Sequence, residues 1–125
     1  MTPGLFLLVA VGGGLGAALR FVVDGLVMRR ASGRFPWGIL VVNTSGSLLL
    51  GLATGLADSS VLAAPWLFVL GAGVLGGYTT FSTAMLDTVV LLQRRAARGA
   101  VLNAVGMLAI TGTAAFVGLV LGRSV

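Results

Sequence analysis

The residues of this chain that could do chemistry are mostly hydroxyl side chains. Four of them lie together in the segment GGYTTFST (residues 76–83): Thr79, Thr80, Ser82 and Thr83. A hydroxyl becomes a nucleophile only beside a general base, and the chain contains no His, Lys or Glu to act as one. It also contains no Cys, which excludes a His/Cys metal cage. The residues therefore disfavour an enzyme and favour a track of hydrogen-bond donors.

The composition is that of a membrane protein. Of its 125 residues, 58% are hydrophobic and 9% are charged, whereas soluble domains are roughly half apolar and a quarter charged. All eight basic residues are arginines, and they lie at the edges of apolar runs rather than over a polar surface, as nucleic-acid binding would require. The net charge of +5 therefore comes from arginines that orient the chain in the membrane, not from a nucleic-acid-binding surface.

Four apolar runs are each long enough to span a bilayer, whose hydrocarbon core of about 30 Å needs about 20 helical residues. They cover residues 5–28, 35–57, 65–92 and 100–122. The first run is not a signal peptide, because it lacks a positively charged N-terminal region and continues past Arg20. The sequence therefore predicts an all-α integral membrane protein with one four-span domain over residues 1–125.

The arginines are distributed unevenly between the two ends of these spans. Six lie in the connectors 29–34 and 93–99, whereas the opposite end carries only Arg123. Because positively charged connectors stay in the cytoplasm, both arginine-rich connectors are predicted to be cytoplasmic and both termini to face outward. A bias of six against one predicts a multi-pass protein of the cell membrane with one fixed orientation.

Polar side chains inside the spans are costly and mark candidate functional positions. Arg20 is followed by Asp24 at i, i+4 spacing, so the two can neutralise each other near an interface, or Arg20 can supply positive potential at the mouth of an anion pathway. Asn43 can form an interhelical hydrogen bond or donate its N–H groups to an anion. Asp87, near the end of the third run, can contact interfacial water or a connector arginine.

The third run, with 28 residues, is too long for one ordinary helix crossing, because it would extend about 42 Å. Gly76, Gly77 and the two β-branched threonines that follow Tyr78 are poor helix sequence near its middle. An unwound turn there would free backbone carbonyls, as in transporters that hold ions at broken helices. The alternative is that the glycine pair is only a notch for helix packing.

Glycine is abundant, with 20 residues in the chain. In lipid, small residues let helix backbones approach closely, and no Walker lysine follows any of these glycines, so packing faces are a better interpretation than phosphate loops. The glycines expected on packing faces are Gly12, Gly13, Gly14, Gly16, Gly46, Gly51, Gly55, Gly106, Gly112 and Gly118.

The segment GGYTTFST resembles the central signature of the Fluc/CrcB fluoride channels. The likeness extends to the whole chain, with its four spans and its length, the motif ALRF ending at Phe21 and the motif VNTSG around Asn43. The resemblance implies four helices with the third interrupted, an antiparallel dual-topology-type dimer with two pores at its interface, and passive export of cytoplasmic fluoride.

The resemblance also implies a structural Na⁺, held by backbone carbonyls that correspond here to Gly76 and Thr79. Phe81 matches the first of two pore phenylalanines, whose ring edges carry partial positive charge and can solvate an anion. In the last span, Asn103, Met107 and Thr111 share one face, although Met107 interrupts the polar track that the family tends to carry there. The candidate fluoride pathway comprises Asn43, Phe81, Ser82, Thr83, Thr80, Arg20 and Thr111.

The sequence departs from the family pattern at Ala84, where the second pore phenylalanine is expected. A dimer of identical chains would lack that ring in both pores, and an antiparallel homodimer would need the same chain to insert in both directions. Together with the arginine bias, Ala84 predicts a heterodimer with a paralogous subunit of opposite bias, in which one of the two pores is degenerate.

Two further functions compete with a fluoride channel. A small multidrug exporter also forms antiparallel four-helix dimers, but it needs a membrane-embedded Glu, and Asp24 beside Arg20 is a poor substitute. A non-conducting partner subunit of a fluoride channel heterodimer remains open because of Ala84.

Overall fold

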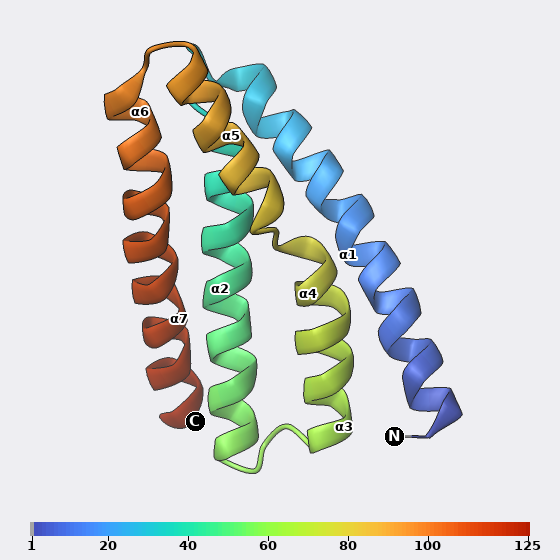
Figure 1. Ribbon diagram of the computed structural model, residues 1–125. Helices are drawn as coiled ribbons and strands as arrows, with labels where there is room; N and C mark the ends of the chain where they lie inside the picture. Colours follow the sequence, from blue (N-terminus) through green and yellow to red (C-terminus); the bar gives the residue numbers. More distant parts are fainter. Residues whose placement is uncertain (1) are drawn as a thin grey trace.

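The computed structural model describes residues 2–125, and within that range all regular structure is helical (Figure 1). Four helical stretches are long and apolar enough to cross a membrane: Pro3–Arg30, Trp37–Asp58, Ala64–Gln93 and Ala97–Arg123. The prediction of four spans is confirmed, with ends that differ from the predicted ones by a few residues.

Two of the spans are single helices and two are composite. The first is α1 (Pro3–Arg30) and the second is α2 (Trp37–Asp58). The third consists of α3 (Ala64–Leu67), the π-helical segment η1 (Phe68–Leu75), α4 (Gly76–Tyr78) and α5 (Ser82–Gln93). The fourth consists of α6 (Ala97–Val101), the π-helical segment η2 (Leu102–Gly106) and α7 (Met107–Arg123).

The third span is interrupted, as predicted, but a few residues later than the glycine pair. Gly76 and Gly77 are still helical, and the chain leaves the helix at Thr79, whose φ and ψ are −78° and 159°. Gly77 packs directly on α1: a Cβ atom there would lie 2.0 Å from the carbonyl oxygen of Gly13. Gly77 is therefore a packing notch, and the break follows that notch, so both interpretations of this segment hold in part.

Glycines bring two pairs of helices into close contact. On α1, a Cβ at Gly16 would lie 2.0 Å from the carbonyl oxygen of Val74 in η1. Between α2 and α7, a Cβ at Gly51 would lie 2.0 Å from the Ala115 oxygen, and one at Gly118 would lie 2.1 Å from the Leu48 oxygen. Such approaches are the usual contacts of membrane helices.

Not every glycine expected on a packing face lies on one in this chain. Among residues 2–125, no atom outside the local helix lies within 4 Å of a Cβ added at Gly14, Gly106 or Gly112. Their expected packing role is therefore wrong within this part of the chain, because these positions of α1, η2 and α7 face away from the other helices.

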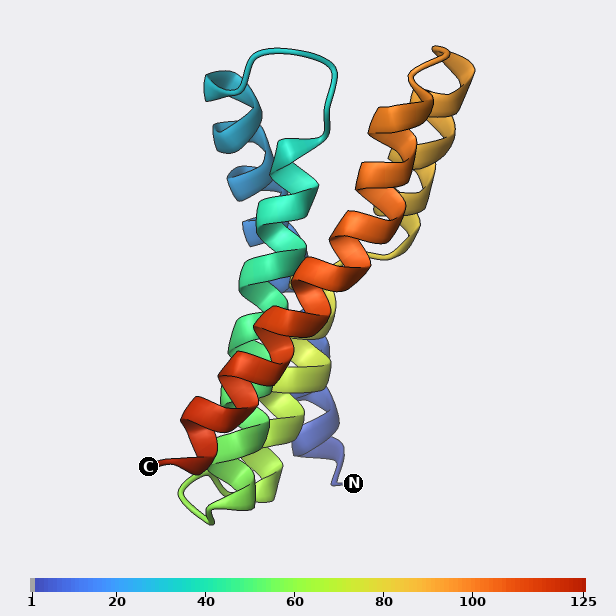
Figure 2. The same cartoon turned by 90° about the vertical axis from the view of Figure 1, so that its left-hand side faces the viewer.

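The helices diverge at one end of the molecule. In Figures 1 and 2, α2 and α7 cross side by side and α1 lies along η1 and α4, whereas α5 and α6 form a hairpin that leans away from the upper parts of α1 and α2. Both termini and the α2–α3 connection lie at the opposite end. The two arginine-rich connectors therefore share one end, as the even number of crossings between them requires.

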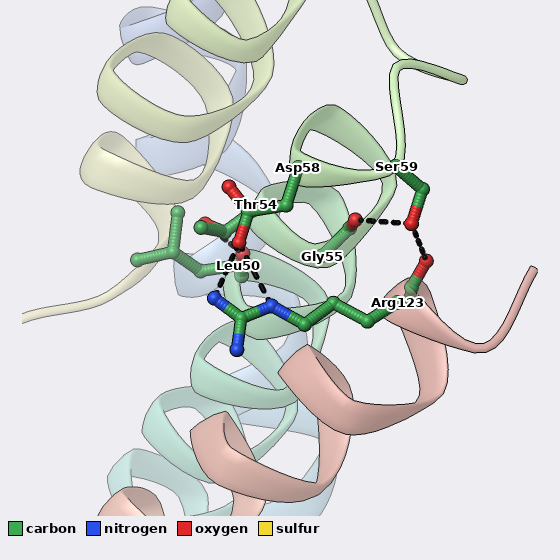
Figure 3. Close-up of polar contacts among 7 residues, drawn as sticks. Leu50, Thr54, Gly55, Asp58, Ser59 and Arg123 are labelled. Carbon is green, nitrogen blue, oxygen red and sulfur yellow. Dashed lines mark hydrogen bonds and ion pairs between the residues drawn. The ribbon is translucent and has the colours of Figure 1, made fainter.

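An ion pair joins α2 and α7 at the end that carries the termini (Figure 3). Arg123 donates from Nε and Nη2 to Oδ2 of Asp58, at 2.9 and 2.6 Å. The adjacent Ser59 hydroxyl lies 3.1 Å from the Gly55 oxygen and 3.2 Å from the Gly122 oxygen, which ties the two helix ends together. The pair is exposed and stabilises the fold by at most about 1 kcal/mol.

Candidate functional site

A side chain of α2 pairs with the backbone at the break in the third span. Asn43 donates from Nδ2 to the Thr80 carbonyl oxygen at 2.8 Å, and the Thr80 N–H donates to Oδ1 of Asn43 at 2.8 Å. Both residues are buried. Asn43 thus satisfies two backbone groups that the interrupted helix leaves without their usual partners, which would otherwise be costly inside a membrane.

The same interruption withdraws the usual donors from two carbonyl groups. In a continuous helix the Thr80 N–H would bond to the Gly76 oxygen, but here it bonds to Asn43. The Thr83 N–H would bond to the Thr79 oxygen, but here it donates to Oγ1 of Thr80 at 3.3 Å. The carbonyls of Gly76 and Thr79 are therefore relieved of their helical donors and are suitable in chemical type for a hard cation such as Na⁺.

Hydroxyl groups gather where α5 begins. Thr80 Oγ1 donates to Thr83 Oγ1 at 3.1 Å and lies 3.4 Å from Ser82 Oγ. Because Thr80 also accepts the Thr83 N–H, its side chain caps the first turn of α5. Three of the four predicted hydroxyls thus form one hydrogen-bonded cluster, whereas the Thr79 hydroxyl bonds to the Leu75 oxygen at 2.9 Å; their use as a donor track stays a prediction.

The break opens onto a groove of about 400 Å³ between α2, the third span and the fourth span. Its lining residues are Asn43, Ser47, Leu50, Gly76, Thr79, Thr80, Phe81, Ala84, Met85, Ala104, Met107, Leu108 and Thr111. Phe81 is 78% exposed there, which is unusual for so large an apolar side chain. Several predicted pathway residues thus meet in one place, and Ser47, one helical turn after Asn43, joins them although the sequence interpretation did not single it out.

Three predicted residues lie outside this groove. Ser82 and Thr83 belong to the hydroxyl cluster but do not line the groove, and Arg20 lies half-exposed on α1. Arg20 does not line the groove of this chain. Its role in an anion pathway therefore stays a prediction.

Of the two interpretations of Arg20, pairing with Asp24 does not occur in this structure. Within residues 2–125, the only ion pair within 4.0 Å is that of Asp58 and Arg123. Asp24 instead lies over Gly38 at the start of α2, where an added Cβ would collide with its carboxylate. A carboxylate beside the first turn of a helix is favoured by the helix dipole, and Asp87 likewise makes no ion pair within the described chain.

The fourth span presents Asn103 and Met107 to different partners. Asn103 is fully buried and donates from Nδ2 to the Ala84 oxygen and to Thr88 Oγ1, both at 2.9 Å. Met107 Sδ accepts the other N–H of Asn43 at 3.3 Å. Asn103, Met107 and Thr111 were predicted to share one helix face, but only Met107 and Thr111 line the groove. The π-helical segment η2 shifts the helical register between Asn103 and Met107.

Ala84 is 1% exposed and packs in one apolar cluster with Ile39 and Met107. The position expected to hold a pore phenylalanine thus lies at the wall of the groove but is packed against its own chain. This contact could not be read from the sequence, because Ile39 and Met107 are far from Ala84 along the chain.

The family model described as CrcB-like protein, Camphor Resistance (CrcB), matches residues 7–120. The chain belongs to the CrcB-like family. Among its CrcB-like relatives is the "Fluoride-specific ion channel FluC 1" of Leifsonia xyli subsp. xyli, which is 48% identical over 122 residues, covering 98% of this chain and 89% of the relative. The resemblance seen in the sequence is confirmed.

Other CrcB-like relatives are similarly close. The "Fluoride-specific ion channel FluC 2" of Mycolicibacterium paratuberculosis is 48% identical over 124 residues, covering 99% of this chain and 98% of the relative. The "Fluoride-specific ion channel FluC" of Thermus thermophilus is 42% identical over 117 residues, covering 94% of each chain. These relatives are named as ion channels, in agreement with the prediction that the chain is not an enzyme.

Proposed function

We propose that the chain is a subunit of a fluoride-selective channel that exports cytoplasmic fluoride by passive flux through the cell membrane. The groove at the broken third span carries this proposal, because it brings together the Asn43 amide, the aromatic ring of Phe81 and the Thr111 hydroxyl on one face of the chain. Fluoride is small and strongly hydrated, so it needs hydrogen-bond donors, and aromatic edges add positive potential without strong trapping. Relatives at 48% identity bear the name fluoride-specific ion channel.

The groove favours an antiparallel dimer over a single chain facing lipid. Polar side chains such as Asn43 and Thr111 are costly against lipid, and an exposed Phe81 offers a surface for a second subunit. The bias of six arginines against one, together with Ala84, favours a paralogous partner over an identical one. Two relatives carry the numbers 1 and 2 in their names, which fits organisms with more than one such protein.

Fluoride efflux from liposomes tests the proposal. We expect rapid, fluoride-selective efflux, followed with a fluoride electrode, from liposomes that contain the chain together with a paralogous four-span chain of opposite arginine bias. Efflux should be much weaker from liposomes with this chain alone. Robust efflux from the chain alone would eliminate the heterodimer, and absence of efflux in every combination would contradict the channel function. A chain that is needed for efflux but tolerates replacement of Phe81 and Asn43 would be a non-conducting partner.

The subunit is further proposed to hold a structural Na⁺ through the carbonyl oxygens of Gly76 and Thr79. Support comes from the loss of their usual helical donors, Thr80 N–H and Thr83 N–H. When bound, the ion would supply positive charge to backbone oxygens that the broken helix leaves uncompensated.

Sodium dependence of stability tests this site. A cation that binds only the folded state raises the melting temperature in proportion to the logarithm of its concentration. We therefore expect the detergent-solubilised protein, with any partner present, to melt at a higher temperature in NaCl than in N-methylglucamine chloride of the same ionic strength. Equal melting temperatures in the two salts would argue against the ion.

A further inference from the structure

The amide of Asn43 has one hydrogen-bond donor left after it has paired with Thr80. Oδ1 and one N–H are both engaged by the Thr80 backbone at 2.8 Å. These two bonds fix the plane of the amide and the direction of its second N–H. Since Asn43 lines the groove, that N–H is the group that the side chain can offer to a ligand there.

The sulfur of Met107 accepts a hydrogen bond from this second N–H. Its Sδ lies 3.3 Å from Nδ2 of Asn43, and the residue is 6% exposed at the start of α7, where it also lines the groove. A thioether is a weak acceptor on a flexible side chain with three rotatable bonds. A hydrogen bond to an anion is roughly twice as strong as one between neutral groups. An anion in the groove can therefore displace the sulfur. The free energy of breaking the Asn43–Met107 bond is then subtracted from the free energy of anion binding.

On the basis of the proposed fluoride function, we propose that Met107 competes with fluoride for the second N–H of Asn43 and so sets the fluoride affinity of the pore that this chain lines. Met107 is thus a residue that sets affinity rather than a passive interruption of a polar face. Its contacts with Ile39 and Ala84 hold the side chain in the position where the sulfur meets Asn43.

Replacing Met107 by leucine tests the competition, because it keeps an apolar side chain of similar size and removes the acceptor. We expect Met107→Leu to lower the half-saturating fluoride concentration for efflux about fivefold, the effect of releasing one weak hydrogen bond. The measurement uses the assembled channel in liposomes over a range of fluoride concentrations. If Met107 only held Asn43 in place, the same change would raise that concentration or abolish efflux.

Met28→Leu is a matched control. Met28 Sδ also accepts an N–H, that of Gly38 at 3.4 Å, but it lies near the α1–α2 connector and outside the groove. This variant should leave the fluoride dependence unchanged. A Met107→Leu channel that is indistinguishable from wild type and from this control would overturn the proposal, whereas a wild-type channel without any fluoride efflux would overturn the proposed function itself.

A second measurement on the unmodified chain keeps the proposal testable even where Met107→Leu does not assemble. In a fluoride titration followed by NMR of the side-chain amides, the Asn43 proton that faces Met107 should shift strongly and the proton bonded to Thr80 should shift little. Equal shifts, or no shift while efflux proceeds, would contradict the competition.

Discussion

Replacement of Asn43 by alanine is expected to abolish fluoride efflux and to lower the melting temperature of the assembled channel. The change leaves the buried N–H and C=O of Thr80 without partners, at about 1–3 kcal/mol each. It also removes the amide donor that faces the groove. Efflux from liposomes and the melting temperature of the detergent-solubilised complex check the two effects separately.

Thr54→Ala is the matched control for that experiment. Thr54 lies on the same helix, α2, and within the described part of the chain its hydroxyl bonds only to the Leu50 carbonyl of its own helix, at 2.8 Å. Its removal should change neither efflux nor melting temperature appreciably. An Asn43→Ala channel that melts and conducts like the Thr54→Ala channel would show that the tie between α2 and the broken span is dispensable.

The second large effect is expected from Gly118→Ala. An added Cβ would lie 2.1 Å from the Leu48 oxygen and 2.8 Å from the Leu52 nitrogen, both of them backbone atoms of α2 that cannot rotate away. Helices α2 and α7 would have to separate, and overpacking of this kind costs about 1–3 kcal/mol. We expect the melting temperature to fall by roughly 5 °C or more.

Gly112→Ala provides the comparison for this change on the same helix. Within residues 2–125, no atom outside the local helix lies within 4 Å of an added Cβ at Gly112, so this variant should melt close to wild type. Equal stability of the two alanine variants would mean that α2 and α7 do not pack as closely as described.

The four spans could be predicted from the sequence because hydrophobic length alone decides them. The interruption of the third span was also predicted, within the segment from Gly76 to Thr80, but not which residues of that segment leave the helix. Gly76 and Gly77 have weak helix preference, yet both stay helical and Gly77 packs against Gly13, and the chain unwinds only where Asn43 can take over the backbone bonds of Thr80. Tertiary contacts therefore outweighed local propensity at this point.

The partners of the polar side chains were harder to predict than the side chains themselves. Arg20 and Asp24 have the spacing of an ion pair, but Asp24 lies over Gly38 on a neighbouring helix. Asn103 and Met107 have the spacing of one face, but a π-helical turn directs them to different neighbours. In each case the decisive contact joins residues of different helices, which periodicity along one helix does not report.

The ion pair of Asp58 and Arg123 has a consequence for the biogenesis of the chain. In the orientation predicted from the arginine bias, both side chains must be carried to the outer face, and moving one positive charge outward against an inside-negative potential costs about 2.3 kcal/mol per 100 mV. Delivery of Asp58 to the same face gains the equivalent amount, so the electrical work for the two side chains cancels. Over the insertion of the whole chain, the lone arginine at that end, which pairs with Asp58, therefore adds no net voltage-dependent cost.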